Sequence, residues 1–117
     1  MASPPLPEEL VDQVLEAFGL QQRPQPDLPG LTQIYAAWCR HVPFDNVRKR
    51  IHLRAADPAP LPGSDPAAFL RAWLQDGTGG TCFPTTGGLA ALLDSLGFRV
   101  NRIVGAVVTH LDDPARE

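Results

Sequence analysis

The sequence lacks long apolar runs and has few cysteines. No apolar run approaches the ~18 residues of a membrane span. The Pro-rich, acidic N-terminus MASPPLPEEL does not resemble a signal peptide. Two cysteines, Cys39 and Cys82, and three scattered histidines indicate neither a disulfide framework nor a zinc-binding pattern. We therefore expect a cytoplasmic protein that holds no metal ion and does not bind a membrane.

Positive charge is also scarce. The net charge is −3 and the pI is about 5.5. The densest basic run, Arg48–Arg50, is expected to form a solvated turn, with contact to an anionic ligand as the alternative. Proteins that bind DNA or RNA need Lys and Arg clustered on one face. The composition therefore argues against a nucleic-acid partner.

Apolar residues recur at helical spacing in four segments, which 13 prolines and 10 glycines help to delimit. One helix is predicted over residues 7–18, and a second carries Leu31, Ile34, Tyr35 and Trp38 on one stripe and ends near His41. A third is predicted from Asp65 to Asp76 and a fourth from about Pro84 to Leu96. With 44% hydrophobic residues, these helices can form the core of one domain.

A single strand is predicted after the helices. FRVNRIVGAVV, from Phe98, is rich in β-branched residues, whereas VPFDNVRKRIHLR is predicted to be a turn or extended segment. The predicted fold is mainly α, a bundle of about four helices followed by one β-strand. Residues 1–6 are expected to form a flexible arm, 7–97 a helical domain with the cysteine, and 98–117 the first strand and loop of a truncated second domain. A lone strand has unpaired edges, so self-association through that edge is expected.

The segment DGTGGTCFPTT sets Cys82 between a Gly-rich loop and an apolar helix pattern. The unpaired N–H groups and dipole of a helix start favour an anion, which suits a nucleophilic thiolate. The preceding glycines allow a sharp turn and close approach of a substrate. This setting suits a cysteine that accepts an acyl group. The alternative is a small buried side chain, as expected for Cys39 in the second helix.

Two motifs carry a resemblance to the arylamine N-acetyltransferases. That family's active-site pattern is Arg-Gly-Gly-x-Cys-aromatic-Glu-x-Asn, followed by a Leu-rich helix and Leu-Gly-Phe. Gly79, Gly80, Cys82, Phe83 and residues 96–98 match it in order and spacing. Upstream, HVPFDN resembles the family's Ile-Pro-Phe-Glu-Asn segment. The two motifs together make the resemblance specific.

The chain departs from the family pattern at three positions. Thr78 stands where the family has Arg, Pro84 where it has Glu, and Thr86 where it has Asn. These departures indicate a divergent branch, in which the usual arylamine specificity is not assured.

The resemblance implies acetyl transfer through a Cys-His-Asp triad. Cys82 would take acetyl from acetyl-CoA and pass it to an arylamine, N-hydroxyarylamine or hydrazine in a ping-pong cycle. Phe44 and Phe83 would line the acceptor pocket, with a place in the core as the alternative. The family's His and Asp lie in a β-rich domain after the cysteine segment.

Three histidines are candidates for the base in this sequence. His41 is expected at a helix end, His52 at the surface, and His110 follows the predicted strand. Whether His110 substitutes for the family's histidine stays open. We therefore expect the acetyl transfer of this chain to be impaired or absent.

Two other functions compete with the enzyme. One is a non-catalytic helical module that needs a partner chain to complete its sheet. The other is a redox-responsive thiol pair, Cys39 with Cys82, which requires Cα atoms less than ~7 Å apart.

Overall fold

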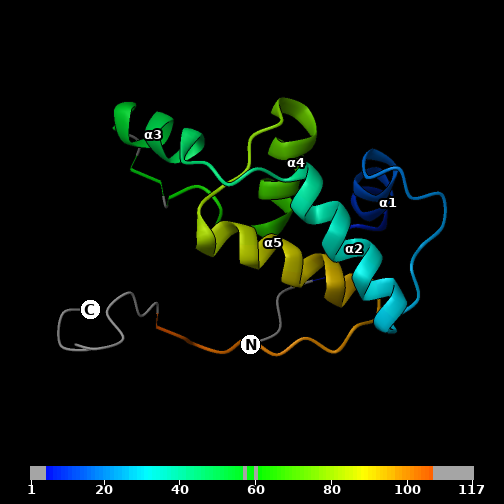
Figure 1. The fold of residues 1–117 in the computed structure, drawn as a ribbon. Helices are drawn as coiled ribbons and strands as arrows, with labels where there is room; N and C mark the ends of the chain where they lie inside the picture. The colour runs from blue at the N-terminus through cyan, green and yellow to red at the C-terminus, as the bar shows by residue number, and fades with distance from the viewer. Residues whose placement is uncertain (1–4, 57, 60, 107–117) are drawn as a thin grey trace.

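A computed structural model describes residues 5–56, 58–59 and 61–106. The described residues form five helices, α1 (Glu8–Ala17), α2 (Leu28–His41), α3 (Val47–Arg54), α4 (Pro66–Asp76) and α5 (Cys82–Ser95) (Figure 1). In this part of the chain the β-interactions are limited to one isolated parallel bridge between Phe44 and Gly80. The predicted mainly α fold is confirmed.

Local capping signals set the ends of the helices. The Asp65 carboxylate accepts a hydrogen bond from the Ala67 N–H at 3.0 Å, and Pro66 occupies the first position of α4. Gly77 ends α4 in the left-handed region with φ +73°, and Gly97 follows α5 with φ +94°. The Asp27 carboxylate caps α2 by accepting from the Gly30 N–H at 2.8 Å. Both ends of α4 and the C-terminal end of α5 agree with the predicted ones, whereas α5 begins at Cys82 rather than near Pro84.

The core lies between α1, α2, α4 and α5. Each of these four helices contributes one large aliphatic side chain that is at most 2% exposed, namely Leu10, Ile34, Leu70 and Leu92. Full burial of such a side chain contributes about 1.5–3 kcal/mol. Leu92 thus packs α5, the helix that begins at Cys82, into this core.

An aromatic cluster joins α1, α2 and α4. The Phe18 ring lies 5.2 Å from that of Trp73, and the Trp38 and Phe69 rings are stacked at 6.3 Å. The Trp73 indole N–H donates to the His41 carbonyl at 3.0 Å, which satisfies a polar atom within this apolar group. The cluster fixes the end of α2, from which the chain leads toward Pro43 and Asp45.

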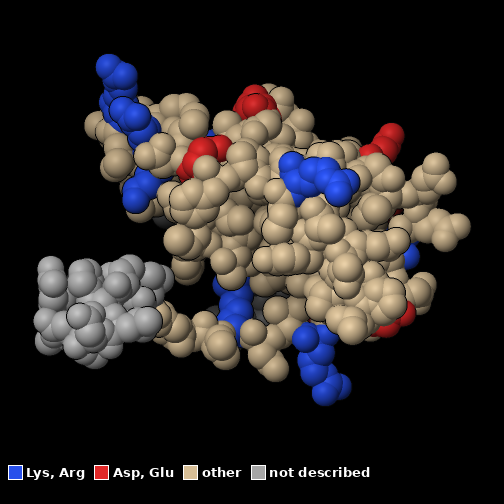
Figure 2. Space-filling view, viewed as in Figure 1, with Lys and Arg blue, Asp and Glu red and all other residues tan. Residues whose placement is uncertain are grey.

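Helix α3 corrects the sequence prediction, which gave this stretch as a turn or extended segment. The Arg50 N–H donates to the Asn46 carbonyl at 2.9 Å and the Ala55 N–H to the Ile51 carbonyl at 3.0 Å. None of the residues of α3 is buried, so no apolar periodicity marks it in the sequence. In Figure 2, Lys and Arg side chains gather over this helix, whose sequence is VRKRIHLR. The basic run is thus exposed, as expected, but helical.

The strand predicted from Phe98 is not formed over residues 98–106. Phe98 packs against the core, but Ile103 is 91% exposed and Val104 is fully exposed. Arg102 donates to the Gly87 carbonyl of α5 at 3.5 Å. A β-strand forms only when its backbone is hydrogen-bonded to a neighbouring strand. Among the described residues, no strand pairs with the backbone of residues 98–106. Residues 107–117, including His110, lie outside the described residues.

Three further residues lie elsewhere than expected from the sequence. Cys39 is exposed rather than in the core, and Tyr35 is 58% exposed rather than on the buried stripe of α2. These two side chains lie one helical turn apart on the outer face of α2, and a side-chain hydrogen bond between the Tyr35 hydroxyl and the Cys39 sulfur raises the pKa of Tyr35. Leu6, at the end of the predicted arm, is buried, and its N–H donates to the Ser95 hydroxyl at 3.3 Å.

None of the described helices is both long enough and apolar enough to cross a membrane.

Candidate active site

Cys82 is the first residue of α5, and its thiol is exposed. The alternative of a buried cysteine is therefore wrong. Thr81 precedes the helix with an extended backbone, but its side chain does not cap it. Within the described part of the chain, the N–H groups of Cys82 and Phe83 have no hydrogen-bond partner, and Pro84 has no N–H. Two backbone donors and the positive end of the helix dipole are thus available to an anion at this point.

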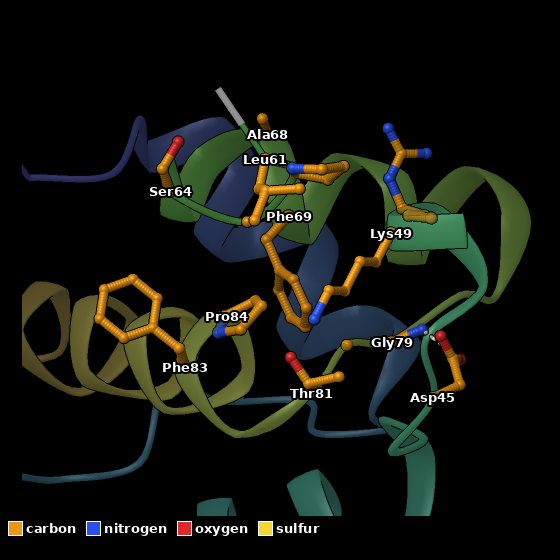
Figure 3. Close-up of a pocket in the computed structure, with 14 residues that line it drawn as sticks. Asp45, Lys49, Leu61, Ser64, Ala68, Phe69, Gly79, Thr81, Phe83 and Pro84 are labelled. Atoms are coloured by element: carbon orange, nitrogen blue, oxygen red, sulfur yellow. Dashed lines mark hydrogen bonds between the residues drawn. The ribbon is translucent and has the colours of Figure 1, made fainter. Parts of the chain in front are cut away.

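The loop before Cys82 is held by a segment far away in the sequence. The Asp45 carboxylate accepts from the Gly79 N–H at 2.9 Å and from the Val47 N–H at 3.2 Å. The Asp45 N–H donates to the Gly80 carbonyl at 3.0 Å, and the Gly80 N–H donates to the Pro43 carbonyl at 3.4 Å. Figure 3 shows Asp45 facing Gly79 across this pairing. The two motifs noticed in the sequence therefore meet directly in space.

Gly79 and Gly80 are required by close approach rather than by an unusual φ. A Cβ at Gly79 would lie 1.6 Å from the Pro43 carbonyl oxygen, and one at Gly80 would lie 2.9 Å from the Phe69 ring. Any other residue at position 79 would push the two segments apart. From the sequence, these glycines were expected to allow a sharp turn and the close approach of a substrate. In the structure, the absence of a side chain at Gly79 lets the Pro43 segment pack against the loop, and its absence at Gly80 leaves room for the Phe69 ring.

Thr78, at the position of the family's Arg, has an unusual environment. Its hydroxyl oxygen is buried and has no hydrogen-bond partner among the described residues. A buried unsatisfied hydroxyl costs about 1–3 kcal/mol. The Thr85 hydroxyl, one turn into α5, instead donates to the Thr81 carbonyl at 2.7 Å and lies 3.1 Å from the Gly80 carbonyl. Of these two threonine hydroxyls, the one at position 78 is therefore the one that lacks a hydrogen bond within the described residues.

Phe44 and Phe83, the predicted acceptor-binding residues, are 69% and 73% exposed. The alternative of a place in the core is therefore wrong for both. Phe83 lines a cavity of about 460 Å³ beside the start of α5, whereas Phe44 and Cys82 are not among the lining residues. Lys49 and Phe69 also line this cavity, and the sequence pattern indicated no site role for Phe69. The only signal in the sequence was the basic run that contains Lys49.

The described histidines lie on other parts of the structure. The His41 ring stacks on Phe18 with the ring centres 5.6 Å apart, at the end of α2. His52 is half-buried on α3. In the residues that the structure describes, the Cys82 thiol has no hydrogen-bond partner, and no group of three His, Cys, Asp or Glu side chains is able to hold a metal ion. A base for Cys82 is therefore not identified in this part of the chain.

Comparisons with known proteins agree with the two motifs. A family model described as N-acetyltransferase matches residues 27–116. An arylamine N-acetyltransferase of Mycolicibacterium smegmatis is 38% identical over 102 residues, which cover 86% of this chain and 34% of that protein. The chain thus spans about a third of the length of this curated relative. No solved structure matches the chain. The chain belongs to the arylamine N-acetyltransferase family.

Proposed function

We propose that Cys82 is the acetyl-carrying nucleophile of an arylamine N-acetyltransferase. One observation carries the proposal: in a chain of this family, an exposed thiol stands at the first residue of α5, beside two unpaired backbone N–H groups. A helix start of this kind stabilises negative charge on or near the sulfur.

The reaction has two halves. In the first, the Cys82 sulfur attacks the thioester carbonyl of acetyl-CoA, the donor substrate. A bond forms between that carbon and the Cys82 sulfur, and the bond between the carbon and the CoA sulfur breaks. The proton that Cys82 loses is taken up by the CoA thiolate that leaves. In the second, an amine nitrogen attacks the acetyl-cysteine, and the Cys82 thiol is released as the amine loses a proton. The cycle is of the ping-pong type.

The backbone of α5 supports the transition states of both halves. Each passes through a tetrahedral carbon with a negatively charged oxygen, and N–H donors aimed at such an oxygen contribute about 10²–10³ in rate. The free N–H groups of Cys82 and Phe83 are the candidates for this role. Because they belong to the helix backbone, they need no reorganisation when the charge develops.

The rate is expected to be low. A positioned general base contributes about 10²–10⁴ in rate, and the Cys82 thiol has no such partner among the described residues. His110 is the candidate that lies outside the described residues. We therefore propose impaired acetyl transfer, with acetylation of Cys82 as its most readily observed step.

The acceptor is proposed to be an arylamine, N-hydroxyarylamine or hydrazine. Phe44 and Phe83 flank this region with exposed rings, and aromatic pairs contribute about 0.5–1.5 kcal/mol beyond the area they bury. We place the reaction in the cytoplasm, since both cysteines are free thiols, as is usual in a reducing compartment.

Peptide mass spectrometry after incubation with acetyl-CoA tests the proposal. Cys39 is an internal control, because it is the other exposed free cysteine of the chain. Cys82 is expected to gain an acetyl group faster than Cys39, and an arylamine or hydrazine is expected to remove it. Equal acetylation of the two cysteines in a folded chain would reject a special role for Cys82.

A non-catalytic interaction module is the second candidate, because apolar side chains stand exposed on residues 98–106. Ile103 is 91% exposed and Val104 is fully exposed. Residues 98–117 are proposed to be the start of a second domain that pairs with a partner or a second copy of the chain. Sedimentation at increasing concentration tests this, with Ile103→Asp/Val104→Asp as the variant expected to prevent association.

A further inference from the structure

We propose that the cavity beside α5 binds a small organic anion that has a flat apolar body, of which an aromatic carboxylate is the simplest case. The site does not use the Cys82 thiol, so the inference goes beyond the acetyl transfer and does not depend on it.

The size and walls of the cavity fit a small apolar body. Its volume is about 460 Å³, within the range of small-molecule pockets. Side chains from α4, the loop before it and the start of α5 converge there, among them Leu61, Phe69, Phe83 and Pro84. Figure 3 shows the Phe69 ring and Pro84 directed toward the same space. Leu61 is 49% exposed and Phe83 is 73% exposed, so their apolar surface is available to a ligand.

The free charge at the cavity is positive. Lys49 is the single lysine of the chain, and it forms no ion pair with the residues that the structure describes. Its side chain extends into the cavity in Figure 3. Arg48 also lines the cavity, but its guanidinium lies 3.9 Å from the Asp76 carboxylate. Lys49 is therefore the cation best placed to receive an anion.

Asp45, the acidic residue of the cavity lining, does not form an ion pair with Lys49. Both carboxylate oxygens of Asp45 accept backbone hydrogen bonds, from Gly79 and from Val47. An exposed ion pair contributes only about 0–1 kcal/mol. A ligand that met Lys49 alone would therefore bind weakly, and contact with the exposed apolar side chains of Leu61 and Phe83 is needed as well. This combination selects an amphiphilic anion over a simple inorganic one.

The ligand would lie beside the thiol rather than on it. Thr81 and Phe83, the two neighbours of Cys82, line the cavity, whereas Cys82 does not. Binding is therefore expected to be the same in the wild-type chain and in Cys82→Ser. This comparison separates a failure of the binding site from a failure of the acetyl transfer.

Benzoate binding followed by NMR tests the inference. Reductive ¹³C-methylation labels Lys49 as the one lysine, and its signal is assigned by its absence in Lys49→Met. Benzoate is expected to shift this signal saturably. For chains without the label, among them Lys49→Met, binding is measured from the change in the aromatic NMR signals of benzoate. Lys49→Met is expected to weaken binding by up to about fivefold. Arg50→Met removes the same charge from the next position of α3, outside the cavity lining, and is expected to leave binding unchanged.

The apolar wall has its own controls. Benzyl alcohol lacks the charge and acetate lacks the ring, so both are expected to bind more weakly than benzoate. Ala68→Phe fills the cavity and is expected to abolish binding, whereas Ala36→Phe adds the same ring to an exposed site on α2. Equal benzoate affinity in wild-type chain, Lys49→Met and Arg50→Met would overturn the inference. So would a shift of the Lys49 signal by inorganic phosphate as strong as that by benzoate.

Discussion

The Asp45 carboxylate accepts a hydrogen bond from the Gly79 N–H at 2.9 Å, across 34 positions of the sequence. This bond joins the HVPFDN motif to the loop that leads into Cys82. The same carboxylate accepts from the Val47 N–H, so one side chain holds the start of α3 and the approach to α5 together. The position of the Cys82 thiol thus depends on a residue on the other side of α4 in the sequence.

Replacing Asp45 is expected to loosen this junction. Asp45→Ala leaves the Gly79 and Val47 N–H groups without their acceptor, which costs about 1–3 kcal/mol in the free energy of unfolding. Asp45→Asn keeps one acceptor oxygen and is expected to cost less. Urea unfolding measures the loss of stability, and hydrogen exchange measures the protection of the Gly79 amide. Unchanged protection of Gly79 in Asp45→Ala would contradict the role given to this carboxylate.

Gly79→Ala is expected to destabilise the chain strongly. Its Cβ would lie 1.6 Å from the Pro43 carbonyl oxygen, so the backbone itself must move. Such overpacking costs about 1–3 kcal/mol or more. Gly105→Ala is the matched control, since a Cβ there has nothing within 4 Å, and its effect is expected to stay within about 0.5 kcal/mol. Thermal unfolding of the two variants gives the comparison, and equal midpoints would show that the Pro43 crossing tolerates a side chain.

Thr78→Val and Thr85→Val are expected to differ, although both remove one hydroxyl. The Thr78 hydroxyl is buried without a partner among the described residues, so its removal is expected to be neutral or to stabilise by about 1 kcal/mol. The Thr85 hydroxyl donates to the Thr81 carbonyl at 2.7 Å, and its loss is expected to cost about 1 kcal/mol. Chemical denaturation measures both changes. A larger loss at Thr78 than at Thr85 would mean that the Thr78 hydroxyl has a partner in solution.

Helix α3 is expected to be the least protected helix in hydrogen exchange. It has 8 residues and none of them is buried, so it lacks the apolar contacts that stabilise short helices. Helix α4 buries Phe69, Leu70 and Trp73 and is expected to be protected by much of the global stability. Amide exchange followed by NMR compares the two directly. Equal protection of α3 and α4 would require packing on α3 beyond the contacts that the described residues make with it.

Much of the helical framework was predictable because its causes are local. Asp65 and Pro66 start α4, Gly77 ends it, and the spacing of apolar residues marks which face turns inward. The same reasoning placed Cys82 near a helix start, although α5 begins at Cys82 itself rather than near Pro84. It failed at α3, which has no apolar face, and at Tyr35 and Cys39, because a stripe on one helix does not show how far a neighbour covers it.

The sequence by itself determined the ends of α4, most of the apolar faces of α1, α2, α4 and α5, and the place of Cys82 near a helix start, because each depends on neighbours within a few positions. Only the tertiary structure decided that Asp45 binds the Gly79 N–H, that Gly79 is needed for the Pro43 crossing, and that Lys49 and Phe69 line one cavity. These relationships join segments far apart in the chain. They arise when the core brings α4 and α5 together, and no local pattern encodes which loops then meet.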